Sequence, residues 1–95
     1  MAAYAIGSLN VHNTAWQQEY VRQMPALLAK YGGKPLCKAY PEVLEGNSLL
    51  PGFAIIVEFP TIEHARGWND DPAHGPLREL RSSGAHFNLI VVDGM

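Results

Sequence analysis

The hydrophobic positions of the chain change their spacing several times, and each change marks the boundary of a predicted element. Residues 3–11 (AYAIGSLNV), 53–59 (FAIIVEF) and 85–92 (AHFNLIVV) are short runs rich in branched and aromatic residues, which is typical of β-strands. Residues 34–46 (KPLCKAYPEVLEG) predict a further strand, interrupted near its second proline because proline cannot donate a hydrogen bond to a neighbouring strand. Residues 47–52 (NSLLPG) predict a turn or loop.

A helix is predicted between the first two strands. Its apolar stripe recurs at helical spacing and consists of Trp16, Tyr20, Met24, Leu27 or Leu28, and Tyr31. Asn13 or Thr14 can cap its start, and with Thr14 as the cap Gln17 would complete a capping box. The glycine pair at 32–33 predicts its end, and Pro25 predicts a kink within it.

The segment before the last strand contains two helical pieces. Thr61 is a suitable N-cap for the first piece. The Asp-Pro pair at 71–72 indicates a break and a new helix start, since aspartate caps a helix and proline fits its first turn. Leu77 and Leu80 then predict a short helix with an inward face, which ends by Gly84.

The order of elements is strand, helix, strand, strand, helix, strand. This order predicts an α+β fold of the ferredoxin-like βαββαβ type, built as one domain over residues 1–95. Its four-stranded antiparallel sheet would have the strand order 4-1-3-2, with the helices on one face.

The strands are apolar on both faces, and this favours a homodimer. A sheet with one wet face normally alternates apolar and polar residues, but residues 52–59 (GFAIIVEF) and 88–92 (NLIVV) do not. A second copy of the chain is the simplest cover for the face without helices, and twofold dimers are the commonest assembly. We therefore expect two subunits to meet through their sheet faces in a dimeric α/β barrel.

Composition narrows the range of partners. The formal net charge is −2 and no block of Lys or Arg occurs, so neither nucleic acid nor an anionic membrane surface is an expected partner. Cys37 is the single cysteine, and no internal disulfide can form. The first residues lack a positive start and a long apolar run, and they do not resemble a signal peptide. We expect a cytoplasmic protein.

Glu58 is the first candidate for acid–base chemistry. It follows Ile56 on one face of a strand predicted to be central, where a carboxylate is costly unless it is paired or hydrogen-bonded. Glu58 could serve as an acid or base at the mouth of a pocket between the sheet and the helices. The alternative, which the sequence favours, is a structural acid that meets Lys or Arg at the end of the sheet.

His12 is the second candidate for acid–base chemistry. In a 4-1-3-2 sheet it falls near the start of the last strand, so a meeting with His86 is expected more readily than one with Glu58. No histidine stands at a metal-ligand spacing, and no phosphate loop or dinucleotide fingerprint occurs. Neither a metal nor a cofactor is expected.

The remaining candidates are residues that could line a ligand pocket. They are Asn10, Trp16, Tyr40, Trp68, Arg78, His86 and Asn88. The aromatic residues among them fit a plain hydrophobic core equally well. Arg78 and Arg81 can share one helix face and hold an anionic ligand, but an Arg-Glu-Leu-Arg segment more often forms a solvated, charge-balanced face.

Three segments resemble the DUF1330 family. They are KYGGKPLCKAYPEVLEG (residues 30–46), VEFPTIEHARGW (57–68) and DDPAHGPLRELR (70–81), followed by an apolar strand that ends in VVDG. The resemblance extends from Tyr4 to Gly94. It implies a ferredoxin-like subunit of a dimeric α/β barrel and no agreed activity.

Two functions remain open at this stage. The first is a homodimer that binds a small organic molecule in a pocket between the sheet and the helices. The alternative is an enzyme of the dimeric α/β-barrel type, similar to monooxygenases or isomerases, that uses Glu58 or a histidine as acid or base.

Overall fold

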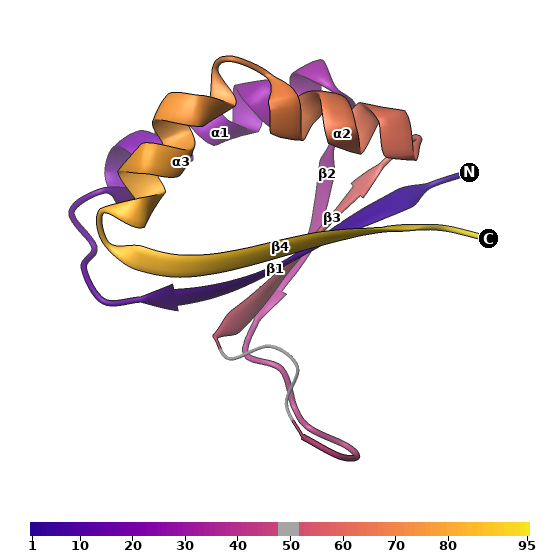
Figure 1. Ribbon diagram of the computed structural model, residues 1–95, viewed down its shortest axis with the longest axis horizontal. Helices are drawn as coiled ribbons and strands as arrows, with labels where there is room; N and C mark the ends of the chain where they lie inside the picture. The colour runs from indigo at the N-terminus through magenta and orange to yellow at the C-terminus, as the bar shows by residue number, and fades with distance from the viewer. Residues whose placement is uncertain (48–51) are drawn as a thin grey trace.

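The computed structural model describes residues 1–47 and 52–95, and this part of the chain contains a four-stranded sheet and three helices (Figure 1). In chain order the elements are β1 (Ala3–Val11), α1 (Gln17–Lys30), β2 (Lys34–Ala39), β3 (Phe53–Phe59), α2 (Ile62–Asp70), α3 (His74–Ser82) and β4 (Ala85–Asp93). The predicted α+β order is confirmed, including the division of the second helical region. The turn predicted at 47–52 lies mostly outside the described residues.

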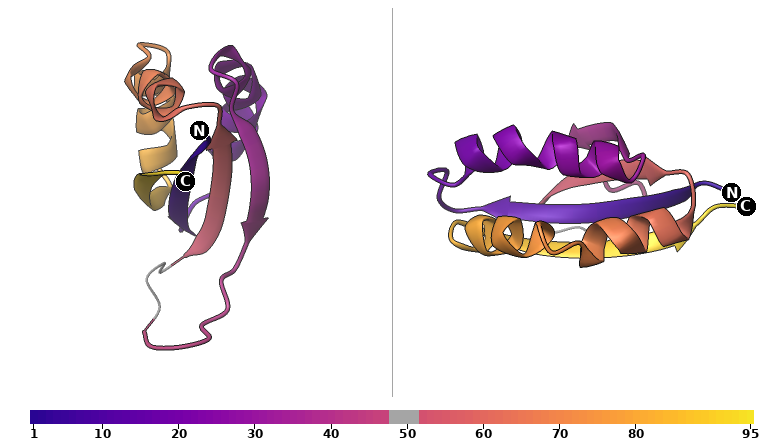
Figure 2. Two further views of the ribbon diagram at one scale, coloured as in Figure 1. Left: turned by 90° about the vertical axis from the view of Figure 1, so that its right-hand side faces the viewer. Right: turned by 90° about the horizontal axis from the view of Figure 1, so that it is seen from above.

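The sheet has the order β2-β3-β1-β4 and is antiparallel throughout, as the ferredoxin-like prediction requires. Ala5 in the central strand β1 stands opposite Val57 of β3 on one side and Val91 of β4 on the other. All three helices cover one face of the sheet, with α1 on one side of β1 and the α2–α3 pair on the other (Figure 2). The molecule is therefore a slab, with extents of 37 × 37 × 17 Å.

None of the three helices covers the other face of the sheet, and we call it the open face (Figure 2). Because side chains alternate along a strand, its members alternate with the residues that pack beneath the helices. They are Lys34, Cys37 and Ala39 of β2, Ala54, Ile56 and Glu58 of β3, Tyr4, Ile6, Ser8 and Asn10 of β1, and His86, Asn88, Ile90 and Val92 of β4.

The hydrophobic core lies between the sheet and the helices. Phe59 at the end of β3 is fully buried, and its ring centroid lies 5.4 Å from that of Trp68 in α2. Leu9 of β1, Trp16 before α1 and Ala85 of β4 form a second cluster toward the other end of the sheet. The side chains thus join all three helices to the same face of the sheet.

The second strand is shorter than the sequence predicts. β2 ends at Ala39 instead of continuing to residue 46, and residues 40–47 form no strand. Pro41 has no N–H to offer a neighbouring strand. Tyr40, just before it, is 82% exposed, so burial does not hold this segment against β3 either.

The start of α1 also differs from the prediction. The helix begins at Gln17, and the residue at its N-cap position, Trp16, makes no side-chain capping bond. The side chain of Asn13 instead accepts a hydrogen bond from the N–H of Ala15 at 2.8 Å, in the turn before the helix. The capping box proposed for Thr14 and Gln17 was wrong, because the local turn around Asn13 delays the helix.

The predicted end of α1 is confirmed. Gly32 has a φ of 70°, in the left-handed region that favours glycine. The N–H of Gly33 donates to the carbonyl of Leu28 at 2.8 Å, and the N–H of Gly32 donates to that of Ala29 at 3.1 Å. This pair of bonds is the Schellman arrangement that closes a helix.

Thr61 caps α2 as predicted. Its side-chain oxygen accepts a hydrogen bond from the N–H of His64 at 3.2 Å.

Asp71 fixes the α2–α3 junction to the end of α1. Its carboxylate accepts hydrogen bonds from Nζ of Lys30 at 2.8 Å and from the hydroxyl of Tyr31, and its second oxygen accepts the N–H of Ala73 at 2.8 Å. The hydrogen bonds from Lys30, Tyr31 and Ala73 hold the pKa of Asp71 well below its ordinary value. This clamp places α2 and α3 beside α1 over the sheet.

Candidate functional site

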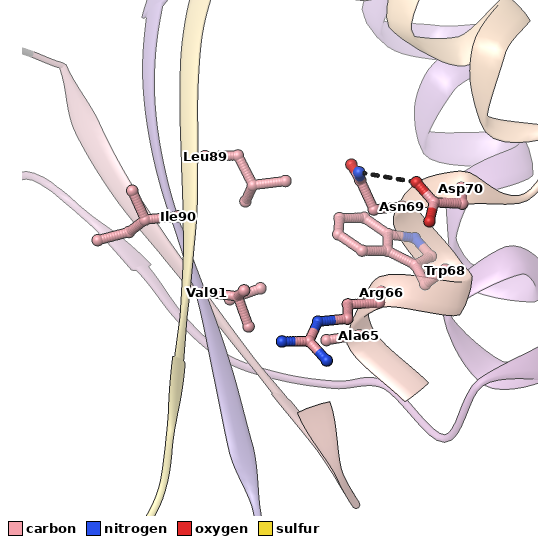
Figure 3. A pocket seen from close by; sticks show the side chains of 9 residues that line it. Ala65, Arg66, Trp68, Asn69, Asp70, Leu89, Ile90 and Val91 are labelled. Carbon is pink, nitrogen blue, oxygen red and sulfur yellow. Dashed lines mark hydrogen bonds between the residues drawn. The ribbon is translucent and has the colours of Figure 1, made fainter. Parts of the chain in front are cut away.

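A cavity of about 230 Å³ opens between α2 and β4. Figure 3 shows Arg66 and Trp68 of α2 on one side and Leu89 and Val91 of β4 on the other, whereas the side chain of Ile90 points away from the cavity. The cavity has an open side, and we call it the outer cavity.

A second cavity of about 110 Å³ lies deeper, beneath α1 and α3. Tyr20 and Met24 of α1 form its roof, and Gly7 of β1 and Phe87 of β4 lie on its floor. It shares the lining residues Ala5, Trp68 and Leu89 with the outer cavity. The two cavities together are called the helix–sheet cleft.

Arg81 of α3 is the charged residue of the inner cavity. The residue is only 7% exposed, and its guanidinium carbon lies 3.8 Å from the centre of the Phe87 ring. One of its terminal nitrogens donates a hydrogen bond to the hydroxyl of Tyr20 at 3.1 Å. Among the described residues no carboxylate forms an ion pair with Arg81, and residues 48–51 include no Asp or Glu.

Gly7 makes the position of Arg81 possible. A Cβ atom at Gly7 would lie 2.7 Å from the ring of Phe87, which is closer than such atoms approach one another. The missing side chain therefore lets the Phe87 ring lie across β1, and the guanidinium of Arg81 stacks on that ring. A glycine in the central strand thus shapes the floor of the cleft.

His74 supports Trp68 from behind. Its ring centroid lies 4.5 Å from that of Trp68, and its Nδ1–H donates to the backbone carbonyl of Trp68 at 3.1 Å. Burial lowers the pKa of His74, with the nearby Arg78 acting in the same direction. His74 is therefore neutral near pH 7 and positions the indole that both cavities share.

Glu58 does not lie in this cleft. Its neighbours Val57 and Phe59 point into the core beneath the helices, so Glu58 points to the open face. There it stands opposite Tyr4 of β1 and Lys34 of β2. The less favoured hypothesis, an acid or base at the mouth of a pocket between the sheet and the helices, does not fit this position, because the strand alternation turns the side chain to the open face.

His12 and His86 lie next to each other, as the strand order predicts, with ring centroids 5.4 Å apart. Asn10 stands directly opposite His86 on the open face, and Asn88 follows two residues later on the same face. These four polar residues therefore gather at one end of the sheet, outside the helix–sheet cleft. In the described part of the chain, no three His, Cys, Asp or Glu side chains lie close enough together to hold a metal ion.

Of the other candidates only Trp68 lines the cleft. Trp16 is packed in the second core cluster, and Tyr40 lies at the β2 edge with its ring 5.8 Å from that of Phe53. Arg78 donates a hydrogen bond to the backbone carbonyl of Asn69, which holds it against α2. None of these three residues lines the helix–sheet cleft.

Tyr20 was not among the predicted site residues, and Arg81 was considered only with Arg78, on a helix face that the sequence favours as solvated and charge-balanced. A signal for Arg81 exists in the sequence, since it stands four residues after Leu77 and so shares the inward face of α3. Tyr20 belongs to the apolar stripe of α1, where a tyrosine is indistinguishable from core until its hydroxyl finds a partner. No helix in the described ranges 1–47 and 52–95 is long and apolar enough to cross a membrane.

Solved structures with the same fold come from several bacteria. The RPA0582 protein of unknown function from Rhodopseudomonas palustris is 14% identical, with a TM-score of 0.75 over 99% of this chain and 82% of that one. SnoaB, a cofactor-independent oxygenase from Streptomyces nogalater, is 9% identical, with a TM-score of 0.67 over 99% of this chain and 93% of that one. A dimeric ferredoxin-like protein of unknown function from Thermobifida fusca is 16% identical, with a TM-score of 0.53 over 99% and 92%.

At these identities the solved structures show the fold alone. No curated protein matches the sequence of this chain. The model of one family, the domain of unknown function DUF1330, matches residues 2–95. Since that match covers nearly the whole sequence, the chain belongs to the DUF1330 family.

Proposed function

We propose that this protein is a homodimer that binds a small organic molecule in the helix–sheet cleft of each subunit. The observation that carries the proposal is unfilled space beside the core, lined by apolar side chains and by one buried cation. A concave, mostly apolar pocket with a few convergent polar groups is the usual form of a small-molecule site.

The lining of the cleft supports an apolar ligand. Met24, Leu28 and Val57 face the inner cavity, and the ring of Trp68 is shared by both cavities. An apolar cavity of about 150 Å³ is large enough to hold benzene. The inner cavity has a volume of about 110 Å³, and the adjoining outer cavity has about 230 Å³. Together they exceed the volume of that benzene-binding cavity.

The open face supports the dimer. Ile56, Ile6 and Ile90 stand next to one another across β3, β1 and β4, and Ile90 is 56% exposed. A contiguous apolar patch on a protein surface marks an interaction site. The proteins from Thermobifida fusca and Bacteroides fragilis, which share the fold, are described as dimeric.

An enzyme of the oxygenase or isomerase type is the second candidate. The fold that the chain shares with SnoaB favours it, but this likeness concerns only the fold. Such an enzyme, if it used Glu58 or a histidine, would need that group at the ligand. In the described chain no glutamate or histidine lines the cleft, and Glu58 and His12 lie elsewhere. Binding is the function that the geometry supports better.

A neutral aromatic probe tests the proposed site. We expect 3-phenylpropan-1-ol to shift the backbone amide signals of Trp68 and Leu89 in an NMR titration. The variant Leu89→Trp fills the space shared by the two cavities, so its affinity for the probe should fall roughly tenfold or more.

Leu89→Met is the matched control, because it conserves volume and should bind as the wild type does. If Leu89→Trp binds the probe as tightly as the wild type, the ligand lies elsewhere. A wild-type protein whose amides respond at millimolar concentration neither to this alcohol nor to the corresponding carboxylic acid contradicts the proposed binding function.

A further inference from the structure

We infer that the ligand of the helix–sheet cleft is a small aromatic monocarboxylic acid, whose carboxylate binds Arg81 and Tyr20 and whose ring lies against Trp68. This inference rests on the proposed binding function and adds the chemical class of the ligand. The juxtaposition that carries it is a buried guanidinium without an acidic partner that lines an apolar cavity.

The charge of Arg81 calls for an anion. Burial of an arginine costs free energy unless its charge is paired and its N–H groups are hydrogen-bonded. The guanidinium has five N–H donors, and its one hydrogen bond within residues 1–47 and 52–95 goes to the Tyr20 hydroxyl. The remaining donors stand ready for an acceptor that the described protein does not supply.

The geometry favours a carboxylate. A guanidinium forms two parallel hydrogen bonds with a planar carboxylate, and the Tyr20 hydroxyl can donate a third. Arg66 and Asp70, of opposite charge, both line the outer cavity and leave no net charge there. The cleft therefore offers one uncompensated positive charge, which matches a monoanion better than a phosphate or a dicarboxylate.

The surroundings of Arg81 favour a flat apolar body behind the carboxylate. Leu28, Ile55 and Val57 line the inner cavity and offer no hydrogen-bonding side chain. The path from Arg81 to the outer cavity passes Trp68 and Leu89, which line both spaces. A ring attached to the carboxylate can thus lie against the indole of Trp68 while the acid end stays at Arg81.

Arg81 is held in place before any ligand arrives. Its stack on Phe87 depends on the missing side chain of Gly7, and its bond to Tyr20 fixes one edge of the guanidinium. A binding group that is already ordered loses little entropy when the ligand binds. The glycine, the phenylalanine and the tyrosine together preorganise the anion site.

A pair of probes of similar shape tests the inference with the wild-type protein. The acid 3-phenylpropanoate and the alcohol 3-phenylpropan-1-ol carry the same ring and differ in charge. We expect the acid to bind roughly 10- to 100-fold more tightly in an NMR or calorimetric titration at low salt.

Arg81→Met removes the charge while keeping an apolar side chain of similar length, and it should abolish the preference for the acid. Arg22→Met is the matched control, because Arg22 is an exposed residue of α1 that does not line the cleft, and it should keep the preference. If Arg81→Met does not fold, Tyr20→Phe removes only the hydroxyl and should lower the affinity for the acid, but not for the alcohol.

The outcomes separate the two proposals. Equal binding of acid and alcohol by the wild type leaves the proposed binding function in place and overturns the carboxylate. A preference that survives Arg81→Met but disappears in Arg66→Gln also overturns the inference, since the anion would then bind at the outer cavity. If neither probe binds, both proposals fail together.

Discussion

The two faces of one sheet show how the same kind of strand can serve two purposes. Beneath the helices, Ala5, Val57 and Phe59 are almost completely buried. On the open face, Ile6 and Ile56 are equally apolar, yet they stay partly exposed in the single chain. The difference lies in what covers each face, since both faces carry side chains that would gain from burial.

The comparison also separates two kinds of polar residue. On the open face, Glu58 and His86 stand at positions where solvent or a second subunit can solvate them. Under the helices, Arg81 is enclosed, so the protein must hold its charge at a cost. A buried charge without a partner indicates binding more strongly than an accessible charge on a strand does.

The largest expected effect is on the helix-covered face. Phe59→Ala empties a fully buried site and should lower the free energy of unfolding by about 3–5 kcal/mol, a large part of the stability of a small domain. Urea unfolding at several protein concentrations measures it. The loss of unfolding free energy should be the same at every concentration. A loss below about 1 kcal/mol would show that the neighbouring core residues can move in to fill the space left by the phenylalanine ring.

The second prediction concerns the open face. Ile6→Asp places a carboxylate in the centre of the proposed dimer interface and should raise the dimer dissociation constant roughly 100-fold or more. Sedimentation equilibrium or light scattering after gel filtration measures the mass. Val21→Asp, on the exposed surface of α1, is the control and should remain dimeric. A wild-type protein that is monomeric at micromolar concentration would remove the dimer from the proposal.

The third prediction uses pH to probe the helical layer. Burial lowers the pKa of His74 below its ordinary value of 6.5, so the unfolded chain binds more protons than the folded chain as the pH falls through that value. The pKa of Asp71 is also lowered, chiefly by its hydrogen bond from Lys30, and its contribution is lost only at pH values below its ordinary 3.8. The free energy of unfolding should therefore fall in two steps on acidification.

Unfolding in urea between pH 7.5 and pH 3 measures the whole of the first step and the beginning of the second. His74→Leu should flatten the step that begins near 6.5 and leave the more acidic step unchanged. The variant keeps a partner for the carbonyl of Trp68, which also accepts the N–H of Asp71 at 3.4 Å in the present structure. If the step that begins near pH 6.5 is unchanged in His74→Leu, that step belongs to the titration of another group.

The smallest expected effect distinguishes a binding residue from a structural one. Arg81→Met should leave the melting temperature unchanged or raise it by a few degrees, because an apolar side chain replaces a buried cation that has no acidic partner. Differential scanning calorimetry measures this. A marked drop in melting temperature would mean that the stacking on Phe87 and the bond to Tyr20 serve the fold itself.

Much of the fold could be predicted from the sequence because its signals are local. The order of strands and helices, the cap at Thr61 and the glycine stop after α1 each depend on a few neighbouring residues. The end of β2 was missed for the opposite reason. Residues 40–46 look like strand in composition, but a strand exists only where a partner accepts its hydrogen bonds.

The sequence by itself determined the ferredoxin-like order of elements and the apolar character of both sheet faces, because periodicity and turn residues act over short distances. Tertiary structure alone decided which face Glu58 joins, since a strand that is apolar on both sides gives no sign of which side meets the helices. It also decided that Arg81 is a cleft residue. That role depends on Gly7, which lies seventy-four positions away along the chain and leaves room for the Phe87 ring beneath the guanidinium. Such a contact exists only once the sheet and the helices have packed together.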